Sequence, residues 1–416
     1  MSAGAPKLAA ATLRPKRRRL REDFPIFGAH PELVYLDSGA SAQKPQAVID
    51  RVSRFYETGY ANIHRGVYGL SAQATEDYDA TRRTVARFLN AREEAEIVFV
   101  RGATEAINLV AQSWGPSHLV AGDHVLLTEL EHHANIVPWQ LLRDRIGILL
   151  DVVPIDDEGG VDMAAFRALL GPRTRLVGVT HVANATGAVN PVAEIVRLAH
   201  AAGALVLVDG AQAVPHRPVD VQALDADFYV FSGHKLYGPT GAGVLYGKAD
   251  ILRAMPPWQG GGDMILSVSF EHTEFQDIPA RFEAGTPDIA GVLGLATAID
   301  YVGEIGWDAI RTHERDLLAH GLKLLQEIPG LHVVPAGKER ASILSFTVEG
   351  IHPHDLGTIL DRHHVAVRAG HHCAQPLLAK LGVHSTVRAS LGLYNEASDL
   401  DALAAALRAA QRMFKR

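Results

Sequence analysis

Short apolar runs that each end in a polar residue recur through the chain, and this pattern constrains the fold more than any other feature. The runs lie at 97–100, 124–128, 176–180, 204–208 and 228–231, and helical segments separate them. Such alternation predicts an α/β fold with a mostly parallel sheet covered by helices. Ligands of such sheets bind outside the carboxyl ends of the strands. The polar residues at those ends are Thr104, His132, Asn184, Asp209, Gln212, Ser232, His234 and Lys235.

Two of these strand-end residues predict a specific cofactor. Lys235 follows the run 228–231, and partial desolvation there would lower its pKa and make the amine nucleophilic, as a Schiff base with an aldehyde cofactor requires. Asp209 closes a neighbouring apolar run, where it would either cap a helix or pair with a protonated pyridine nitrogen. Together they indicate pyridoxal phosphate.

The other strand-end residues complete this interpretation. The strand 97–100 is followed by Gly-Ala-Thr104 and a helix, so free backbone N–H groups and a hydroxyl would form a phosphate seat. Ser232 and His234 are further candidates to bind the phosphate, and His132 is a candidate to stack on the ring.

Several long motifs resemble the class V aminotransferase family, and more narrowly the SufS-type (group II) cysteine desulfurases. The motifs are Ser-Gly-His-Lys235-Leu-Tyr-Gly-Pro, Val-Asp209-Gly-Ala-Gln212-Ala, Glu131-His132-His-Ala-Asn and Arg281-Phe-Glu-Ala-Gly-Thr286-Pro. The resemblance runs from about Phe24 to near the C-terminus. It implies pyridoxal-phosphate fold type I, with a mostly parallel seven-stranded sheet in a large domain and a smaller α+β C-terminal domain.

The resemblance also implies a role for each site residue. Lys235 would hold the cofactor covalently, Asp209 would pair with its pyridine nitrogen and Gln212 would bond its ring oxygen. His132 would stack on the ring and assist proton transfer. The implied phosphate ligands are Thr104, Ser232 and His234, with Thr286 arriving from the second subunit of a homodimer. The implied residues for binding the substrate are Asn184, Arg388, Arg368 and His64, with Arg388 making a two-point contact to the carboxylate.

The single cysteine, Cys373, is the expected nucleophile. It lies in Arg368-Ala-Gly-His-His-Cys373-Ala, where His371, His372 and Arg368 would favour its thiolate if they are close in space. The resemblance implies that L-cysteine is converted to L-alanine, that a persulfide forms on Cys373, and that the sulfur passes to an acceptor for iron–sulfur cluster assembly. The alternatives are a selenocysteine lyase and, less favoured because the lysine, aspartate and cysteine are all present, a scaffold without turnover.

A histidine-containing stretch predicts the sulfur acceptor. Gly350-Ile-His-Pro-His354-Asp resembles desulfurases that pass sulfur to the zinc protein SufU rather than to SufE, and His354 would capture the zinc of that partner. The adjacent histidine pairs elsewhere have poor spacing for a closed zinc site, so no intrinsic metal site is expected.

Composition sets the remaining expectations. The net charge of −7 over 416 residues points to neither nucleic acid nor an anionic membrane as a partner, and one cysteine permits no intrachain disulfide, which fits the cytoplasm. Residues 1–21 are expected to form a disordered basic tail, although a transit-like presequence or a nucleic-acid contact would share this composition. We expect 22–35 to pack with the small domain, 36–300 to form the large domain and 301–416 to form the small domain carrying Cys373.

Overall fold

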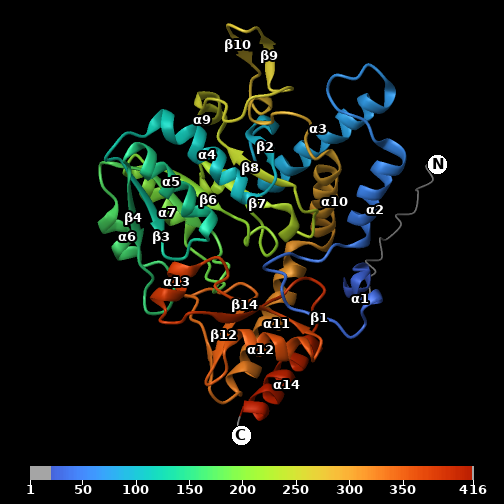
Figure 1. The fold of residues 1–416 in the computed structure, drawn as a ribbon, viewed down its shortest axis with the longest axis vertical. Helices are drawn as coiled ribbons and strands as arrows, with labels where there is room; N and C mark the ends of the chain where they lie inside the picture. Colours follow the sequence, from blue (N-terminus) through green and yellow to red (C-terminus); the bar gives the residue numbers. More distant parts are fainter. Residues whose placement is uncertain (1–19, 415–416) are drawn as a thin grey trace, which may run out of the picture.

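The protein, described here by a computed structural model, consists of a large α/β unit and a smaller C-terminal unit that lies below it in Figure 1. The structure describes residues 20–414. The large unit is built on a seven-stranded sheet with the order β2-β8-β7-β6-β5-β3-β4. Only β8 runs antiparallel to its neighbours, so the prediction of a mostly parallel seven-stranded sheet is confirmed. The strands are Ile97–Val100 (β2), His124–Thr128 (β3), Leu149–Val153 (β4), Thr174–Thr180 (β5), Leu205–Asp209 (β6), Phe228–Ser232 (β7) and Gly243–Gly247 (β8).

The central strands β6, β7 and β8 are almost entirely apolar because both faces of the sheet are buried there. In β6, for example, Val206 and Val208 pack into one hydrophobic cluster while Leu207 packs into the other, as the alternation of side chains along a strand requires. The helices of this unit are Gln46–Arg54 (α2), Gly69–Leu89 (α3), Ala103–His118 (α4), Val137–Ile146 (α5), Met163–Leu169 (α6), Val192–Ala201 (α7), Val221–Leu224 (α8), Ala249–Ala254 (α9) and Ile289–Ile305 (α10).

The C-terminal unit has its own sheet and its own core. Its four antiparallel strands have the order β11-β12-β15-β14, and they are Leu331–Val333 (β11), Ile343–Val348 (β12), Thr386–Ser390 (β15) and Arg368–Gly370 (β14). A third hydrophobic cluster lies between this sheet and helices α11, α12 and α14. The helices are Trp307–Gln326 (α11), Pro353–Asp361 (α12), Gln375–Lys380 (α13) and Ala397–Phe414 (α14). This arrangement confirms the expected α+β architecture.

The N-terminal segment joins the two units. It comprises η1 (Leu20–Asp23), α1 (Ile26–Ala29) and β1 (Val34–Tyr35), and β1 pairs in parallel with β13 (Val365–Ala366) of the small unit. Arg21 contributes to this docking, because its guanidinium bonds the backbone oxygen of Leu33 and the carboxylate of Asp399. The tail predicted for 1–21 is therefore wrong at its last two residues, and the rest of it lies outside the described residues.

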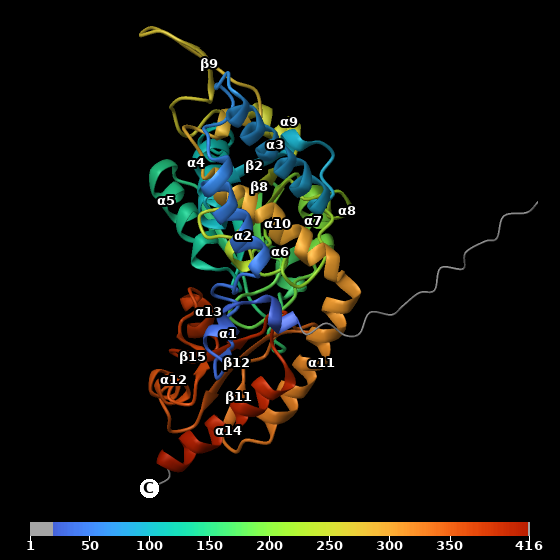
Figure 2. The ribbon, with the colours of Figure 1, turned by 90° about the vertical axis from the view of Figure 1, so that its right-hand side faces the viewer.

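One domain boundary also needs correction. The boundary expected between residues 300 and 301 falls inside α10, a continuous helix that ends at Ile305. Figure 2 shows α10 and α11 in succession, with α10 against the large sheet and α11 against the small unit. Among residues 20–414, no single helix is long and apolar enough to cross a membrane; α10 and α11 pass that test only together, across a bend of 79°.

Candidate active site

A cavity of about 170 Å³ lies at the carboxyl ends of the central strands, between the two units. This is the position predicted for a ligand of a parallel sheet. The cavity brings together most of the residues predicted from the sequence, namely Thr104, His132, Asn184, Asp209, Gln212, Ser232, His234, Lys235, Arg368 and Arg388.

Lys235 and Asp209 occupy neighbouring strand ends. Lys235 lies in the turn η5 (Gly233–Lys235) after β7, and Asp209 is the last residue of β6, which pairs in parallel with β7. Burial lowers the pKa of Lys235 to about 8, although the nearby Asp209 carboxylate opposes this shift. Burial likewise raises the pKa of Asp209, and the Lys235 ammonium opposes it. The lysine is thus able to supply a free amine near neutral pH.

Neighbouring backbone and ring groups hold Asp209 in place. The backbone N–H of His181 donates to the Asp209 carbonyl oxygen at 2.8 Å, and the His181 ring pairs with the Tyr229 hydroxyl at 3.0 Å. A Cβ atom on Gly210 would lie 2.2 Å from the Tyr229 hydroxyl oxygen, so only glycine fits between Asp209 and Ala211. The carboxylate is further fixed by the N–H of Ala211, which donates to Oδ1 at 2.9 Å.

His132 is held as a neutral ring at the wall of the cavity. Burial first, and the Lys235 charge second, lower the pKa of His132 to about 3. Its Nδ1 accepts a hydrogen bond of 3.0 Å from the Ala134 N–H, which leaves the proton on Nε2. The preceding residue, Glu131, is fully buried and accepts bonds from Thr128, Asn135 and the backbone of Thr180, which fixes the loop carrying His132.

The predicted phosphate seat forms where β2 meets α4. Ser232 Oγ accepts a 2.8 Å hydrogen bond from the N–H of Ala103, the first residue of α4, so the Ser232 hydroxyl proton is available to an anion. Thr104 follows in the first turn of this helix, and His234 also lines the cavity. The carbonyl of His234 accepts the Ala42 N–H at 3.0 Å, which anchors η5 to the N-terminal segment.

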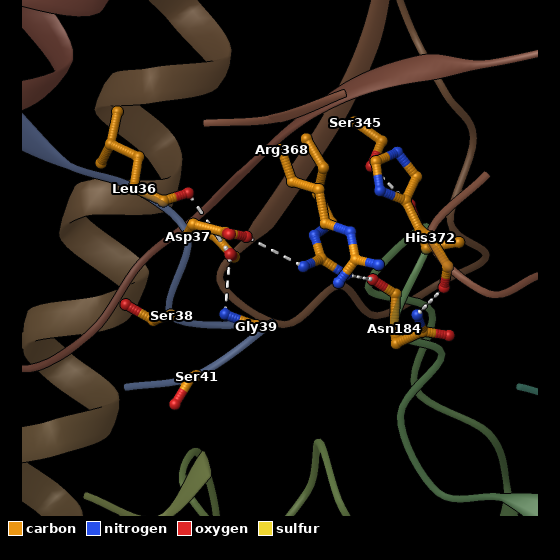
Figure 3. Close-up of polar contacts among 12 residues, drawn as sticks. Leu36, Asp37, Ser38, Gly39, Ser41, Asn184, Ser345, Arg368 and His372 are labelled. Atoms are coloured by element: carbon orange, nitrogen blue, oxygen red, sulfur yellow. Dashed lines mark hydrogen bonds and ion pairs between the residues drawn. The ribbon is translucent and has the colours of Figure 1, made fainter. Parts of the chain in front are cut away.

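Arg388, on β15 of the small unit, also lines the cavity. It is 1% exposed, and its guanidinium donates to the Asn184 carbonyl at 2.9 Å and to Asp37 at 3.2 Å. Figure 3 shows Asp37, Asn184, Arg368 and His372 converging at this point from three parts of the chain. The sequence interpretation missed Asp37, although the signal that identified Asp209, an acid closing a short strand before a glycine turn, is also present there.

Cys373 lies at the edge of the cavity beside Arg368. The thiol is half-buried, and Arg368 Nη2 lies 3.7 Å from Sγ. Cys373 and His372 both have positive φ angles, 55° and 54°, which are uncommon for residues other than glycine. Two bonds from the large unit hold this backbone: the His133 N–H donates to the Cys373 carbonyl at 2.7 Å, and Asn184 Nδ2 donates to the His372 carbonyl at 2.5 Å.

His372, one of the two histidines before the cysteine, does not act as expected. Burial lowers the pKa of His372 to about 3, so its ring is neutral, and Nε2 pairs with Thr386 rather than with the thiol. The prediction that His372 would favour the Cys373 thiolate is therefore wrong for this arrangement. Arg368 is the cation that contacts the sulfur.

Three predicted residues lie outside the cavity of their own chain. His64 and Thr286 are exposed on the large unit, and His354 is exposed in the first turn of α12. The backbone N–H of His64 donates to Thr75 Oγ1 at 2.9 Å, which fixes the backbone of His64. Its ring lies outside the cavity of its own chain. Within residues 20–414, no group of three His, Cys, Asp or Glu side chains is arranged to hold a metal ion.

The residues of this cavity fit pyridoxal phosphate. The Asp209 carboxylate can pair with the pyridine nitrogen, the Lys235 amine can hold the aldehyde carbon, and Ser232 with the start of α4 can hold the phosphate. Two buried polar atoms, Asn184 Oδ1 and Arg388 Nε, have no hydrogen-bond partner among the described residues, so the site retains an acceptor and a donor for a bound group.

Comparisons with known proteins agree with this geometry. The model of the class-V aminotransferase family matches residues 34–403. A cysteine desulfurase of Dickeya dadantii is 53% identical over 400 residues, covering 95% of this chain and 97% of the relative. A cysteine desulfurase of Synechococcus elongatus is 52% identical over 94% of this chain, and the match spans 63% of that longer relative.

The solved structures give the same result. The crystal structure of the cysteine desulfurase CsdA from Escherichia coli, in its S-sulfonic acid form, superposes with a TM-score of 0.89 at 41% identity, covering 95% of this chain and 98% of that one. The chain therefore belongs to the class-V aminotransferase family, and its relatives there are the pyridoxal-phosphate-dependent cysteine desulfurases.

Proposed function

We propose that the protein converts L-cysteine to L-alanine and retains the sulfur as a persulfide on Cys373. The observation that carries this proposal is the position of the only cysteine, at the edge of the cavity with Arg368 3.7 Å from its sulfur. A thiolate is the nucleophilic form of cysteine, and the Arg368 guanidinium is the cation beside this sulfur. The related proteins are named cysteine desulfurases, so we do not propose the selenocysteine lyase alternative.

The residues of the cavity would divide the work as follows. Pyridoxal phosphate supplies an electron sink for bonds to the substrate carbons. Arg388 binds the substrate carboxylate, and the Lys235 amine, with its pKa near 8, moves the proton at the α-carbon. The Cys373 thiolate forms an S–S bond with the substrate sulfur while the Cβ–S bond breaks. The electron pair of that bond remains with the carbon, which takes a proton to become the methyl group of alanine.

One experiment tests this function directly. L-cysteine is added to purified, cofactor-loaded enzyme, and free alanine is measured together with thiol-labile sulfur bound to Cys373. We expect both products in equal amounts in the first turnover. The Cys373→Ser variant should keep the cofactor absorbance and lose desulfuration. Alanine without protein-bound sulfur would refute the persulfide mechanism.

The sulfur acceptor is a second part of the proposal. We infer that a SufU-type zinc protein accepts the sulfur and passes it to an iron–sulfur scaffold. The exposed position of His354 in the first turn of α12 supports this inference, because a zinc ion on a partner could reach its ring. His354→Ala should abolish the stimulation of turnover by SufU and leave unstimulated turnover intact, with His332→Ala as an exposed control. Unchanged stimulation would contradict the role of His354.

We also propose that the enzyme is a homodimer. Apolar side chains are almost fully exposed on the β9–β10 hairpin (Ile265–Val268 and Thr273–Phe275), which projects from the large unit in Figure 1, and on the loop before α3. Val67 and Phe270 are 103% and 107% exposed. An Arg65–Asp263 ion pair of 3.3 Å and the Gly285 N–H bond to Gly262 link the segments carrying these residues to those carrying His64 and Thr286.

A shared interface would therefore deliver His64 and Thr286 to the cavity of a second subunit. The Phe270→Asp variant should shift the sedimentation coefficient from that of a dimer to that of a monomer, whereas Tyr56→Asp, at another exposed aromatic, should not. A dimer that survives the hairpin substitution would contradict this assignment. The cytoplasmic location remains a proposal based on the single cysteine, and cell fractionation would test it.

A further inference from the structure

We propose that Asp37 acts as a built-in carboxylate that orients Arg388 and competes with the carboxylate of the amino-acid substrate and product, thereby weakening the binding of both. This inference rests on the proposed function, since it takes Arg388 as the residue that binds the α-carboxylate. Asp37 would be a positioning residue that sets substrate affinity rather than a group that reacts.

The contact between Asp37 and Arg388 is an ion pair at the wall of the cavity. Arg388 Nη2 lies 3.2 Å from Asp37 Oδ1, while the side chains are 1% and 24% exposed respectively. The other terminal nitrogen, Nη1, donates to the Asn184 carbonyl at 2.9 Å. The guanidinium is thus fixed from two sides, and its Nε is the buried donor without a partner among the described residues. An incoming carboxylate finds an arginine that is already oriented.

The backbone gives Asp37 little freedom to move away. Ser38 N–H donates to the Ser390 carbonyl at 3.2 Å, and Ser390 N–H donates to the Leu36 carbonyl at 2.7 Å, so the segment is attached to β15 on both sides of Asp37. Gly39 N–H adds a 2.8 Å bond to Ser390 Oγ. Figure 3 shows Leu36, Asp37, Ser38 and Gly39 along this attached segment. The backbone that carries the Asp37 carboxylate is therefore held next to the strand that carries Arg388.

The fixed carboxylate must repel a second one. Burial raises the pKa of Asp37, and the two cations that face it, Arg388 and Arg368, oppose this shift. A substrate carboxylate on the same guanidinium would stand a few ångströms from Asp37, in a region of reduced dielectric. Like charges at such a distance repel appreciably, and the repulsion acts equally on L-cysteine and on the product L-alanine.

Neutral variants of Asp37 test this inference. Asp37→Asn keeps an oxygen that can accept from Arg388 but removes the charge, so L-alanine should bind to the cofactor-loaded enzyme about tenfold more tightly, measured from the absorbance of the bound cofactor. The KM for L-cysteine should fall by a similar factor with kcat unchanged, as expected for uniform binding. Asp37→Ser, also neutral, should tighten binding in the same direction. A merely structural role would instead weaken binding.

Two controls separate the effect of the Asp37 charge from other effects of the substitutions. L-alaninamide lacks the carboxylate, so its affinity should be the same in wild type and in both variants. Asp77→Asn removes a carboxylate that pairs with Arg51 on the surface and should leave L-alanine affinity unchanged. Unchanged or weaker L-alanine binding in the folded Asp37 variants overturns the inference. The proposed function fails separately, if the wild-type enzyme binds L-alanine but releases no sulfur from L-cysteine.

Discussion

The buried ion pair between Arg82 and Glu283 should contribute strongly to the free energy of unfolding of the large unit. Arg82, on α3, makes a two-point contact with Glu283, with N–O distances of 2.7 and 2.9 Å. The two side chains are 8% and 11% exposed. Glu283 Oε1 also accepts the N–H of Phe99 on β2 at 2.7 Å, so one carboxylate ties the Arg281–Thr286 segment to both α3 and the sheet.

Replacing Glu283 with Gln leaves the Arg82 charge buried without a counterion. Breaking a buried pair by removing one partner typically costs about 3–5 kcal/mol, and we expect about 3 kcal/mol because Gln retains an oxygen for the Phe99 N–H. The free energy of unfolding would be measured by urea titration of apo-enzyme, followed by tryptophan fluorescence. The double variant Arg82→Met with Glu283→Gln should lose less than the sum of the single losses, since no unpaired charge remains.

A matched surface pair provides the comparison. Arg51 and Asp77 lie 2.7 Å apart with side chains 29% and 30% exposed, so Asp77→Asn should cost less than about 1 kcal/mol. If Glu283→Gln costs no more than Asp77→Asn, the reasoning from burial is refuted. Additive losses in the double variant would refute the claim that the two residues act as a pair.

Three further predictions concern the centre of the site. The rate of pyridoxal phosphate incorporation into apo-enzyme should rise with pH, with its midpoint near pH 8, because the Lys235 amine loses its proton at its lowered pKa of about 8. An ordinary lysine would give a rate that still rises toward pH 10. Asp209→Asn should move this midpoint to lower pH, since the Asp209 charge raises the Lys235 pKa, and an unmoved midpoint would contradict the coupling. Gly210→Ala should lower the free energy of unfolding by about 1–3 kcal/mol because its Cβ would overlap the Tyr229 ring, whereas Gly28→Ala, with open space around it, should not.

Local patterns in the sequence predicted the sheet and one half of the site. The apolar runs before Asp209 and Lys235 identified β6 and β7, and parallel pairing then placed their ends together without further information. Strands β4 and β8 were not among the runs predicted from the residues. The direction of β8 could not be predicted either, because an apolar run does not reveal whether its strand runs parallel or antiparallel. The chain returns through β8 after a short glycine-rich loop, which suffices only for an antiparallel connection.

The other half of the site depends on contacts between distant parts of the chain. Asp37 and Arg388 are separated by 351 positions, and Arg82 and Glu283 by 201, so no local periodicity links either pair. The motif resemblance supplied Arg388 but not its partner, because a motif names residues and not their contacts. His372 shows the same limit, since only the structure reveals that its ring turns toward Thr386 instead of the thiol.

Under the proposed function, the left-handed backbone at His372 and Cys373 would limit how sulfur leaves the enzyme. Bonds from His133 and Asn184 hold both carbonyls from the large unit, so any long excursion of the thiol requires breaking two hydrogen bonds that cross between the units. A persulfide on Cys373 would therefore stay at the edge of the cavity, because the segment that carries it is not a long mobile loop. Under the proposed function, the acceptor would have to approach Cys373, and it would need its own cysteine on a segment narrow enough to reach the edge of the cavity.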